Sequence, residues 1–332
     1  MGSRHFGEAI GEDFELPPDQ AYCETCAAIS SVMVAWRLLL ATGDERYADV
    51  IERTVYNAIA VSPSEQGDAF FYANPLQKRV PGQPSDPDQI CPRATSQLRA
   101  PWFTVSCCPT NVARLFASLS ALWATVDGST LRLHQFAPGS IDAQLADGRQ
   151  VTLQVRTGYP YDGRIEIEVL QAPAGEWELA VRIPAWSATA ELTGLERQGQ
   201  LARARGLVTG SVVMMELDLE PRVVVPDSRI DAVRGCVAIE RGPLVLCLES
   251  VDLPDGAPVD EFVLDATRSP TSAGDGAEVS GWLLRPAPTA WPYPRADGSA
   301  APLTPVRARL VPYQRWGNRG PSTMRAWLPA RA

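Results

Sequence analysis

The first third of the chain has the apolar spacing of α-helices. Residues 26–43, CAAISSVMVAWRLLLATG, are almost continuously apolar, which predicts a helix buried on most sides that ends at Gly43. In residues 44–61 apolar side chains recur every three or four positions, as in an amphipathic helix. A loop rich in Pro and Asp follows at about 62–104, and residues 111–126 then repeat the helical pattern. This pattern predicts helices up to about residue 126 that cannot close a core alone.

From about residue 129 the hydrophobic period changes to two, the period of half-buried strands. Four segments alternate in this way, with turn sequences at 146–148 and 161–163 between them: residues 129–136, 150–157, 163–171 and 177–184. Further strands are predicted at 211–221 and 235–250, and closing strands at 306–320 and 323–329. Residues 252–305 are rich in Pro, Ala, Asp and Ser and are expected to form a surface excursion. The spacing favours a β-sandwich, or two of them.

Composition and charge exclude several classes of protein. A chain of 332 residues with 45% hydrophobic and 21% charged residues is expected to be globular, with one or two full cores. The net charge of -9, with scattered arginines, offers no basic stripe for a nucleic acid. We find no apolar run of about 18 residues and no secretion signal, so we expect no membrane association and a cytoplasmic location.

The seven cysteines do not indicate a disulfide framework, because their number is odd and the chain is long. Cys236 and Cys247 lie in apolar runs and are expected in a core, whereas Cys91 lies in a loop and has no assigned role. The remaining four lie in two motifs, AYCETCAAIS and VSCCPTNVAR, at predicted helix starts: Cys23, Cys26, Cys107 and Cys108. Their placement makes them candidates for chemistry.

Helix starts favour the thiolate form of cysteine, which binds metals and attacks carbon, because unpaired N–H groups and the helix dipole face it. Pro109 is expected in the first helical turn, which places Cys107 and Cys108 at the N-terminus of that helix. Glu24 and Cys26 can bind the same metal ion only if Glu24 lies in an extended segment before the first turn. The Pro-rich sequence that precedes them makes this geometry reasonable.

Two metal-ligand sets fit the spacing, and a third interpretation has no metal at all. Cys23, Cys26, Cys107 and Cys108 would make a closed four-sulfur zinc site that only braces the fold. The alternative set contains Glu24 in place of Cys23, which gives one carboxylate and three thiolates. One of these thiolates can react. A thioredoxin-like redox pair at Cys23 and Cys26 is disfavoured, because no βαβ pattern surrounds it. The spacing alone leaves the choice open.

Longer motifs resemble the β-L-arabinofuranosidase family, glycoside hydrolase family 127. They run in order along nearly the whole chain: GEAIGEDFELPPDQAYCETCAA, FFYANPL, PWFTVSCCPTNVARLFASL, TGYPYDG, VRIPAW, CVAIERGPLVLCLESVD and PYQRWGNRGPSTMRAWLP. The Glu-Thr-Cys triplet, the Cys-Cys-Pro-x-Asn element and the Trp-x-Asn-Arg-Gly tail are the most specific of these. The resemblance implies a mixed, multi-domain fold: the C-terminal part of an (α/α)6 catalytic barrel over residues 1–127, then a β-sandwich region over 128–332.

The resemblance also implies a catalytic centre. By similarity, a zinc ion is held by Glu24, Cys26, Cys107 and Cys108, which leaves Cys23 as a bystander. Cys107 is then the nucleophile and Glu8 the acid/base of a retaining glycosidase that acts on β-L-arabinofuranosides through a thioglycosyl intermediate. A zinc-bound sulfur stays ionised at neutral pH, so no histidine is needed to activate it.

The other polar and aromatic candidates have weaker assignments. Four residues are candidate sugar contacts, with a core or loop role equally open: His5, Tyr72, Asn74 and Trp102. His134, at the end of a predicted strand, is expected to be structural. The expected partner is therefore a carbohydrate.

A six-hairpin barrel needs more helices than this segment encodes. We therefore expect the helices to expose apolar faces, and the chain to be inactive unless the missing N-terminal half of the barrel is supplied, for example as a separate chain. The alternative function is a non-catalytic β-sandwich module that binds carbohydrate or a protein partner and has a structural zinc site.

Overall fold

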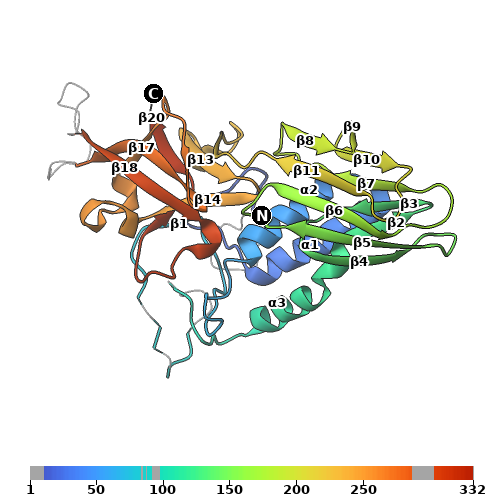
Figure 1. Ribbon diagram of the computed structural model, residues 1–332. Coiled ribbons are helices and arrows are strands. Elements are labelled where there is room, and N and C mark those ends of the chain that lie inside the picture. The colour runs from blue at the N-terminus through green and yellow to red at the C-terminus, as the bar shows by residue number, and fades with distance from the viewer. Residues whose placement is uncertain (1–10, 84, 87, 92–97, 286–302, 332) are drawn as a thin grey trace.

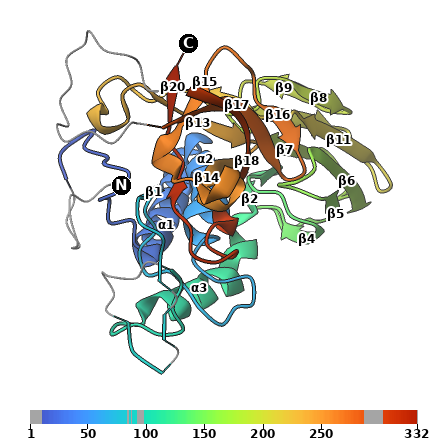
Figure 2. The ribbon, with the colours of Figure 1, turned by 90° about the vertical axis from the view of Figure 1, so that its left-hand side faces the viewer.

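The computed structural model describes residues 11–83, 85–86, 88–91, 98–285 and 303–331. The fold is mixed and has several regions, with few helices and many strands. Figure 1 shows the helices between two β regions, the middle strands on one side and the C-terminal strands on the other. In Figure 2, α3 lies at the lower end of the molecule, away from strands β8 and β9.

The first helix forms as its sequence predicts. Helix α1 spans Thr25–Thr42, and Gly43 ends it in the left-handed conformation at φ 67°, where its N–H donates to the carbonyl of Leu39. Helices α2 (Arg46–Arg53) and α3 (Cys107–Ser118) pack against α1. The three helices share a core that includes Ile29, Val32 and Leu115.

The second and third predicted helices end differently from the expectation. After α2 the chain continues as a π-helix, Thr54–Ile59, in which buried Asn57 donates to the carbonyl oxygens of Arg53 and Pro243 and accepts from the N–H of Val245. These bonds join the helices to the C-terminal β region. The third helix was predicted to reach residue 126, which is wrong. After α3 and a 3-10 turn at Leu119–Leu122, Ala124–Asp127 form a strand, because they pair with Thr130–Leu133.

The middle region consists of two five-stranded sheets that contribute to one hydrophobic core. The first sheet has the order β2-β3-β7-β10-β9: Ala124–Asp127, Thr130–Leu133, Glu178–Arg182, Leu201–Arg205 and Glu196–Gln198. The second has the order β4-β5-β6-β11-β8: Gly139–Gln144, Gln150–Thr157, Arg164–Gln171, Val212–Leu217 and Ala190–Thr193. Residues alternate between buried and partly exposed along β5 and β6, as the period of two predicts.

The C-terminal region is built on one ten-stranded sheet, which also takes β1 (Gln77–Lys78) from the loop before α3. Its other strands are β12 Arg222–Val224, β13 Cys236–Arg241, β14 Leu244–Glu249, β15 Phe262–Asp265, β16 Thr271–Ala273, β17 Gly276–Leu284, β18 Leu303–Pro312, β19 Met324–Arg325 and β20 Leu328–Arg331. The predicted excursion at 252–305 is wrong for residues 262–284, which form three of these strands. β17 pairs with β18 along eight residues, and its alternating buried positions lie in the core, despite the Pro- and Asp-rich flanks.

A buried polar network joins the helices to the middle sheets. Arg182 of β7 is fully buried and pairs with Asp49 and Glu52 of α2. Glu52 also accepts hydrogen bonds from the Tyr159 hydroxyl at 2.6 Å and the Trp186 indole N–H at 3.0 Å. Burial opposes the charge of Arg182, but the two carboxylates raise its pKa above the usual value, so it stays protonated.

Helices α1 and α3 also have exposed apolar side chains. Met33, Val34 and Leu40 of α1 have exposed fractions of 45%, 57% and 56%, and Phe116 of α3 is 48% exposed. The expected exposed apolar faces are therefore present. By length and composition, α1 also meets the criterion for a membrane span, so the expectation that no segment does so is wrong. The core helix of a soluble protein meets the same criterion, so this match alone does not assign α1 to a membrane.

Candidate metal and catalytic centre

The two cysteine motifs meet where α1 and α3 begin. Glu24 is the residue before the first turn of α1, and its extended backbone (φ -72°, ψ 138°) removes it from the helical spiral that carries Cys26. This is the condition under which the two side chains can converge. Cys107 and Cys108 open α3, with Pro109 in its first turn, as predicted.

Four ligand atoms come together at this junction. The sulfur of Cys26 lies 3.7 Å from that of Cys108, and the sulfurs of Cys107 and Cys108 are 3.9 Å apart. The Cys107 sulfur is 3.7 Å from a carboxylate oxygen of Glu24. All four atoms lie within 4.8 Å of one another, and among the described residues Cys23 does not belong to this group. The geometry thus assembles the glutamate-containing set, not the four-sulfur set.

No cationic side chain is among the contacts of these four groups within the part of the chain that the structure describes. Glu24 and Cys108 are buried. Burial raises the pKa of Cys26 to about 11, with a further contribution from neighbouring Cys107. Burial and the two neighbouring thiols raise the pKa of Cys108 further. A bound cation would compensate for this cost, since it favours thiolate over thiol.

The donor set fits zinc. Zn²⁺ is a borderline-soft ion that accepts both soft thiolates and a hard carboxylate in a four-coordinate site. The four atoms are close enough to bind one ion, and no rearrangement of the two helix starts is needed to bring them together. The residues present therefore fit a single zinc ion.

Two neighbouring side chains contact the sulfurs. The Asn111 side-chain amide donates to the Cys26 sulfur at 3.0 Å, and the Tyr72 hydroxyl lies 3.4 Å from the Cys107 sulfur. Asn111 belongs to the Cys-Cys-Pro-x-Asn element, of which only the two cysteines were predicted as ligands. The sequence could have indicated this contact, because Asn111 lies four residues after Cys107 and hence on the same face of α3.

The predicted sugar contacts are placed in different environments. Tyr72 and Asn74 are buried, with exposed fractions of 1% and 2%, and Asn74 donates to the hydroxyl of Thr25. Trp102 is 52% exposed and lines a hollow of about 310 Å³ together with Phe70 and Pro109. His5, the fourth predicted sugar contact, and Glu8, the predicted acid/base, lie outside the described residues.

The remaining cysteines and His134 have the environments that a structural role requires. Cys236 and Cys247 are buried free thiols, as predicted. Cys91, which had no assigned role, packs against the cluster formed by Phe103 and Cys108. His134 is 1% exposed and hydrogen-bonds to Glu45 at 3.0 Å and to the hydroxyl of Thr125 at 2.8 Å, which confirms the expectation of a structural histidine.

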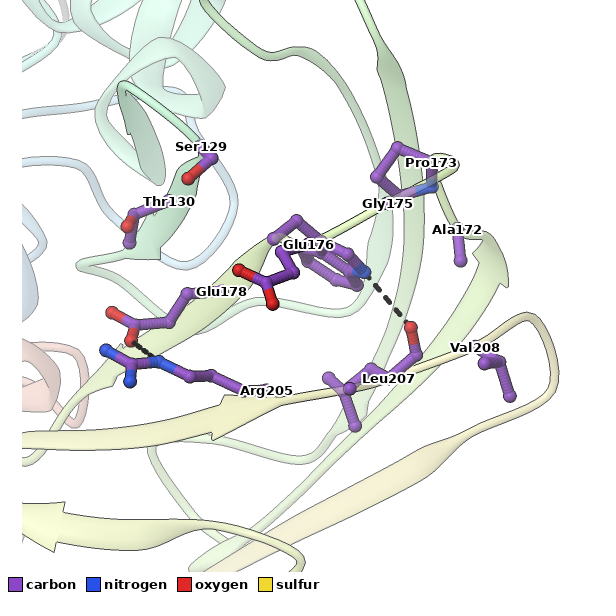
Figure 3. Close-up of a pocket in the computed structure, with 12 residues that line it drawn as sticks. Ser129, Thr130, Ala172, Pro173, Gly175, Glu176, Glu178, Arg205, Leu207 and Val208 are labelled. Atoms are coloured by element: carbon purple, nitrogen blue, oxygen red, sulfur yellow. Dashed lines mark hydrogen bonds and ion pairs between the residues drawn. The ribbon is translucent and has the colours of Figure 1, made fainter.

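A larger hollow of about 640 Å³ lies at one end of the middle sheets, and its lining includes no cysteine. Figure 3 shows Arg205 beside Glu178 at its edge, where the two side chains form an ion pair. Glu178 also pairs with Arg203, and the indole N–H of Trp177 donates to the carbonyl of Leu207. Glu178 in this hollow is thus paired with two arginines, whereas the contacts given above for the cysteine cluster, within the described residues, include no cationic side chain.

Three family models match successive parts of the chain. Residues 1–121 match the β-L-arabinofuranosidase GH127 catalytic domain, residues 130–204 the GH127 middle domain, and residues 221–329 the glycoside hydrolase family 127 C-terminal domain. The match to the catalytic-domain model includes both cysteine motifs.

Known proteins resemble the chain over its whole length. It is 32% identical over 354 residues to a non-reducing end β-L-arabinofuranosidase of Bifidobacterium longum subsp. longum, a match that covers 98% of this chain and 52% of that protein. A crystal structure of a GH127 β-L-arabinofuranosidase from Geobacillus stearothermophilus T6 matches with a TM-score of 0.84 and 31% identity over 99% of this chain and 53% of that one. Another GH127 β-arabinofuranosidase gives a TM-score of 0.81 at 28% identity, with 100% and 53% covered. The chain thus spans about half the length of these relatives.

Proposed function

Because the chain belongs to glycoside hydrolase family 127, we propose that it contributes the zinc-thiolate centre of a retaining β-L-arabinofuranosidase. The observation that carries this proposal is the convergence of Glu24, Cys26, Cys107 and Cys108 within 4.8 Å. When bound by these four side chains, zinc would keep the thiols ionised at neutral pH. The relatives are β-L-arabinofuranosidases, so the proposed substrates are β-L-arabinofuranosides.

Cys107 is the proposed nucleophile. It lies at the N-terminus of α3 and is only partly buried, whereas Cys108 is fully buried. Accessibility and the helix N-terminus both favour attack by the Cys107 sulfur on the anomeric carbon of the sugar. The sulfur–carbon bond forms as the bond to the leaving oxygen breaks. Tyr72, with its hydroxyl 3.4 Å from that sulfur, holds its orientation.

Glu8 is the proposed acid/base, on the strength of the motif that contains it. Its carboxyl group would give its proton to the departing oxygen and later take one from the water that releases the sugar from sulfur. Two displacements at one carbon restore the original configuration. The reaction is therefore retaining, and the products are a free arabinose and the shortened glycan.

We propose that the helices are part of an (α/α)6 barrel over residues 1–127 and that residues 128–332 form β-sandwich domains. Two observations support this division: the pair of sheets around one core, and the exposed apolar side of α1 and α3. That side is the proposed contact for the part of the family's catalytic domain that this chain does not match. Covering this side would remove Val34 and Leu40 from water.

The function is tested by hydrolysis of an aryl β-L-arabinofuranoside. The assay compares the chain alone with the chain co-expressed with the part of a family member that it does not match. We expect turnover only in the combination, and its loss when Cys107 is replaced by Ala or Glu8 by Gln. Cys236→Ala is the matched control and should keep the rate. Turnover that survives the loss of Cys107 would refute the proposed nucleophile.

The second candidate is a non-catalytic module that binds carbohydrate or a protein partner, with zinc as a structural brace. The exposed apolar side of α1 and α3 favours partner binding. In this case zinc binds and raises stability, but neither the chain nor the combination hydrolyses the glycoside. The same assay therefore separates the two candidates.

A further inference from the structure

The segment that carries Tyr72 is tied to the segment that carries Glu24. Residues Glu24 and Ala73 form an antiparallel bridge, in which the Thr25 N–H donates to the Tyr72 carbonyl at 3.1 Å and the Asn74 N–H donates to the Cys23 carbonyl at 2.8 Å. The Thr25 hydroxyl adds a bond to the carbonyl of Phe71. These bonds fix Glu24 and Tyr72 relative to each other.

Neighbouring side chains of this segment belong to different cores. Phe70 and Tyr72 belong to the cluster that contains Phe103 and the cysteines. Phe71, between them, belongs to a different cluster, which is made mainly by the C-terminal β region and includes Trp316. The position of Tyr72 is thus coupled to how Phe71 is held.

Phe71 is held by two side chains, and we call the three residues Arg99, Phe71 and Trp316 the Phe71 stack. The rings of Phe71 and Trp316 are nearly parallel, with centroids 5.0 Å apart and an interplanar angle of 16°. The guanidinium carbon of Arg99 lies 4.4 Å from the centroid of Phe71. Phe71 and Trp316 are almost completely buried, with exposed fractions of 1% and 0%.

Arg99 connects the parts of this stack through hydrogen bonds to oxygen atoms. Its guanidinium donates to the carbonyls of Val61, Ser62 and Trp316 and to the side-chain oxygen of Asn318. The Ser62 carbonyl in turn accepts from the N–H of Phe71. Burial lowers the pKa of Arg99 to about 10, so the group is still protonated at neutral pH.

The loop that carries Trp316 is built to fit closely. Gly317 has φ +72°, and a Cβ there would lie 3.4 Å from a ring carbon of Phe71 and 3.6 Å from a nitrogen of Arg99. Its N–H donates to Glu249 of β14, which fixes the loop to the C-terminal sheet. A side chain at this position would strain the loop beside the stack.

We propose that the Phe71 stack is a positioning device by which the C-terminal β region holds Glu24 and Tyr72 against the three cysteines. The inference rests on the proposed function of that centre, because it assigns a role toward the same ligands. Trp316 and Arg99 act through Phe71 and do not touch the reacting atoms. The C-terminal β region then contributes to the geometry of the metal-binding centre, although it supplies none of the four ligands.

The test measures amide hydrogen exchange at Thr25 and Asn74 in the full chain, since these two N–H groups form the bonds that the stack is proposed to hold. We expect Trp316→Leu to speed their exchange at least about tenfold and Trp316→Phe to restore it, because phenylalanine keeps a ring on Phe71. Phe262→Leu is the matched control: it removes a buried aromatic ring from the other core of the same region and should change these rates less than about twofold.

A second readout follows the metal centre itself. The zinc dissociation constant should rise about 10- to 100-fold in Trp316→Leu and stay unchanged in Phe262→Leu. If Trp316→Leu does not fold, Gly317→Ala serves in its place, with the same amides measured.

Unchanged Thr25 and Asn74 exchange in a folded stack variant would overturn the proposal, and so would equal acceleration in Phe262→Leu. The exchange measurement needs neither hydrolysis nor bound metal. If the combination with the unmatched part of a family member lacks glycosidase activity but the amides of the chain respond as expected, the proposed function is refuted and the positioning role is supported.

Discussion

Two buried clusters of ionisable groups lie at different ends of the helical region. Around Arg182, the buried charges are matched: one guanidinium meets Asp49 and Glu52, and Glu52 also accepts from Tyr159 and Trp186. Around Cys107, four groups that can only become negative face one another. The comparison teaches that burial alone does not mark a functional site. A cluster complete within the chain stabilises the fold, and one that lacks its counter-charge awaits a ligand.

Breaking the complete cluster should have the largest effect on the fold. Arg182→Met leaves Asp49 and Glu52 without their cation, so we expect the free energy of unfolding to fall by about 3–5 kcal/mol. Denaturant titration measures it. Arg156→Met, which removes an exposed pair with Glu166 and Glu168, is the control and should cost less than about 1 kcal/mol. A loss as small for Arg182 as for Arg156 would contradict the comparison.

Removing a ligand from the incomplete cluster should affect metal binding and not the metal-free fold. Cys108→Ser is expected to weaken zinc binding at least about 100-fold, measured by competition with a chelator. The unfolding free energy of the metal-free chain should change far less than in Arg182→Met, because no charged pair is broken. Cys236→Ser is the control and should leave the zinc affinity unchanged. Equal zinc affinity in Cys108→Ser and the unchanged chain would exclude Cys108 as a ligand.

The zinc affinity of the incomplete cluster should depend on pH. The pKa of Cys26 is raised to about 11 and that of Cys108 is raised further, so both thiols are protonated near neutral pH without metal. Zinc must displace these protons, and its affinity should therefore rise with pH, by about tenfold per unit for each proton released between pH 6 and 8. Chelator competition at two pH values measures this slope. A flat profile would mean that no thiol loses its proton on binding.

The smallest effect is expected from a neighbour of the ligands. Asn111→Ala removes the hydrogen bond to the Cys26 sulfur, so zinc binding should weaken by about tenfold. Thr110→Ala, at the adjacent exposed position, is the control and should have no effect. An effect of Asn111→Ala as large as that of Cys108→Ser would show that Asn111 does more than orient a ligand.

Much of the fold was predictable because local pattern and tertiary environment agree. Gly43 ends α1 as expected, and β5 has the bounds that alternation indicates. The predictions were wrong where pairing overrides local preference. Residues 124–126 continue a helical pattern but join β3, and the strands within 262–284 are masked by Pro- and Asp-rich flanks.

The candidate site was predictable in its ligands but not in its support. The Glu-Thr-Cys and Cys-Cys-Pro motifs identify the four groups that meet in the structure. The contacts of Trp316 with Phe71 and with Arg99 join segments separated by more than two hundred residues, and no local pattern encodes such a meeting. Asn111 is an intermediate case: it is not one of the predicted ligands, but its spacing of four residues from Cys107 places both on one face of a helix.

The most direct test of the central claim is the zinc content of the purified, folded chain after equilibration with Zn²⁺ and removal of excess metal. The account predicts one ion per chain and none in a variant that carries both Glu24→Gln and Cys108→Ser. A folded chain that retains no more zinc than this double variant would contradict the claim that the four convergent side chains form a metal centre.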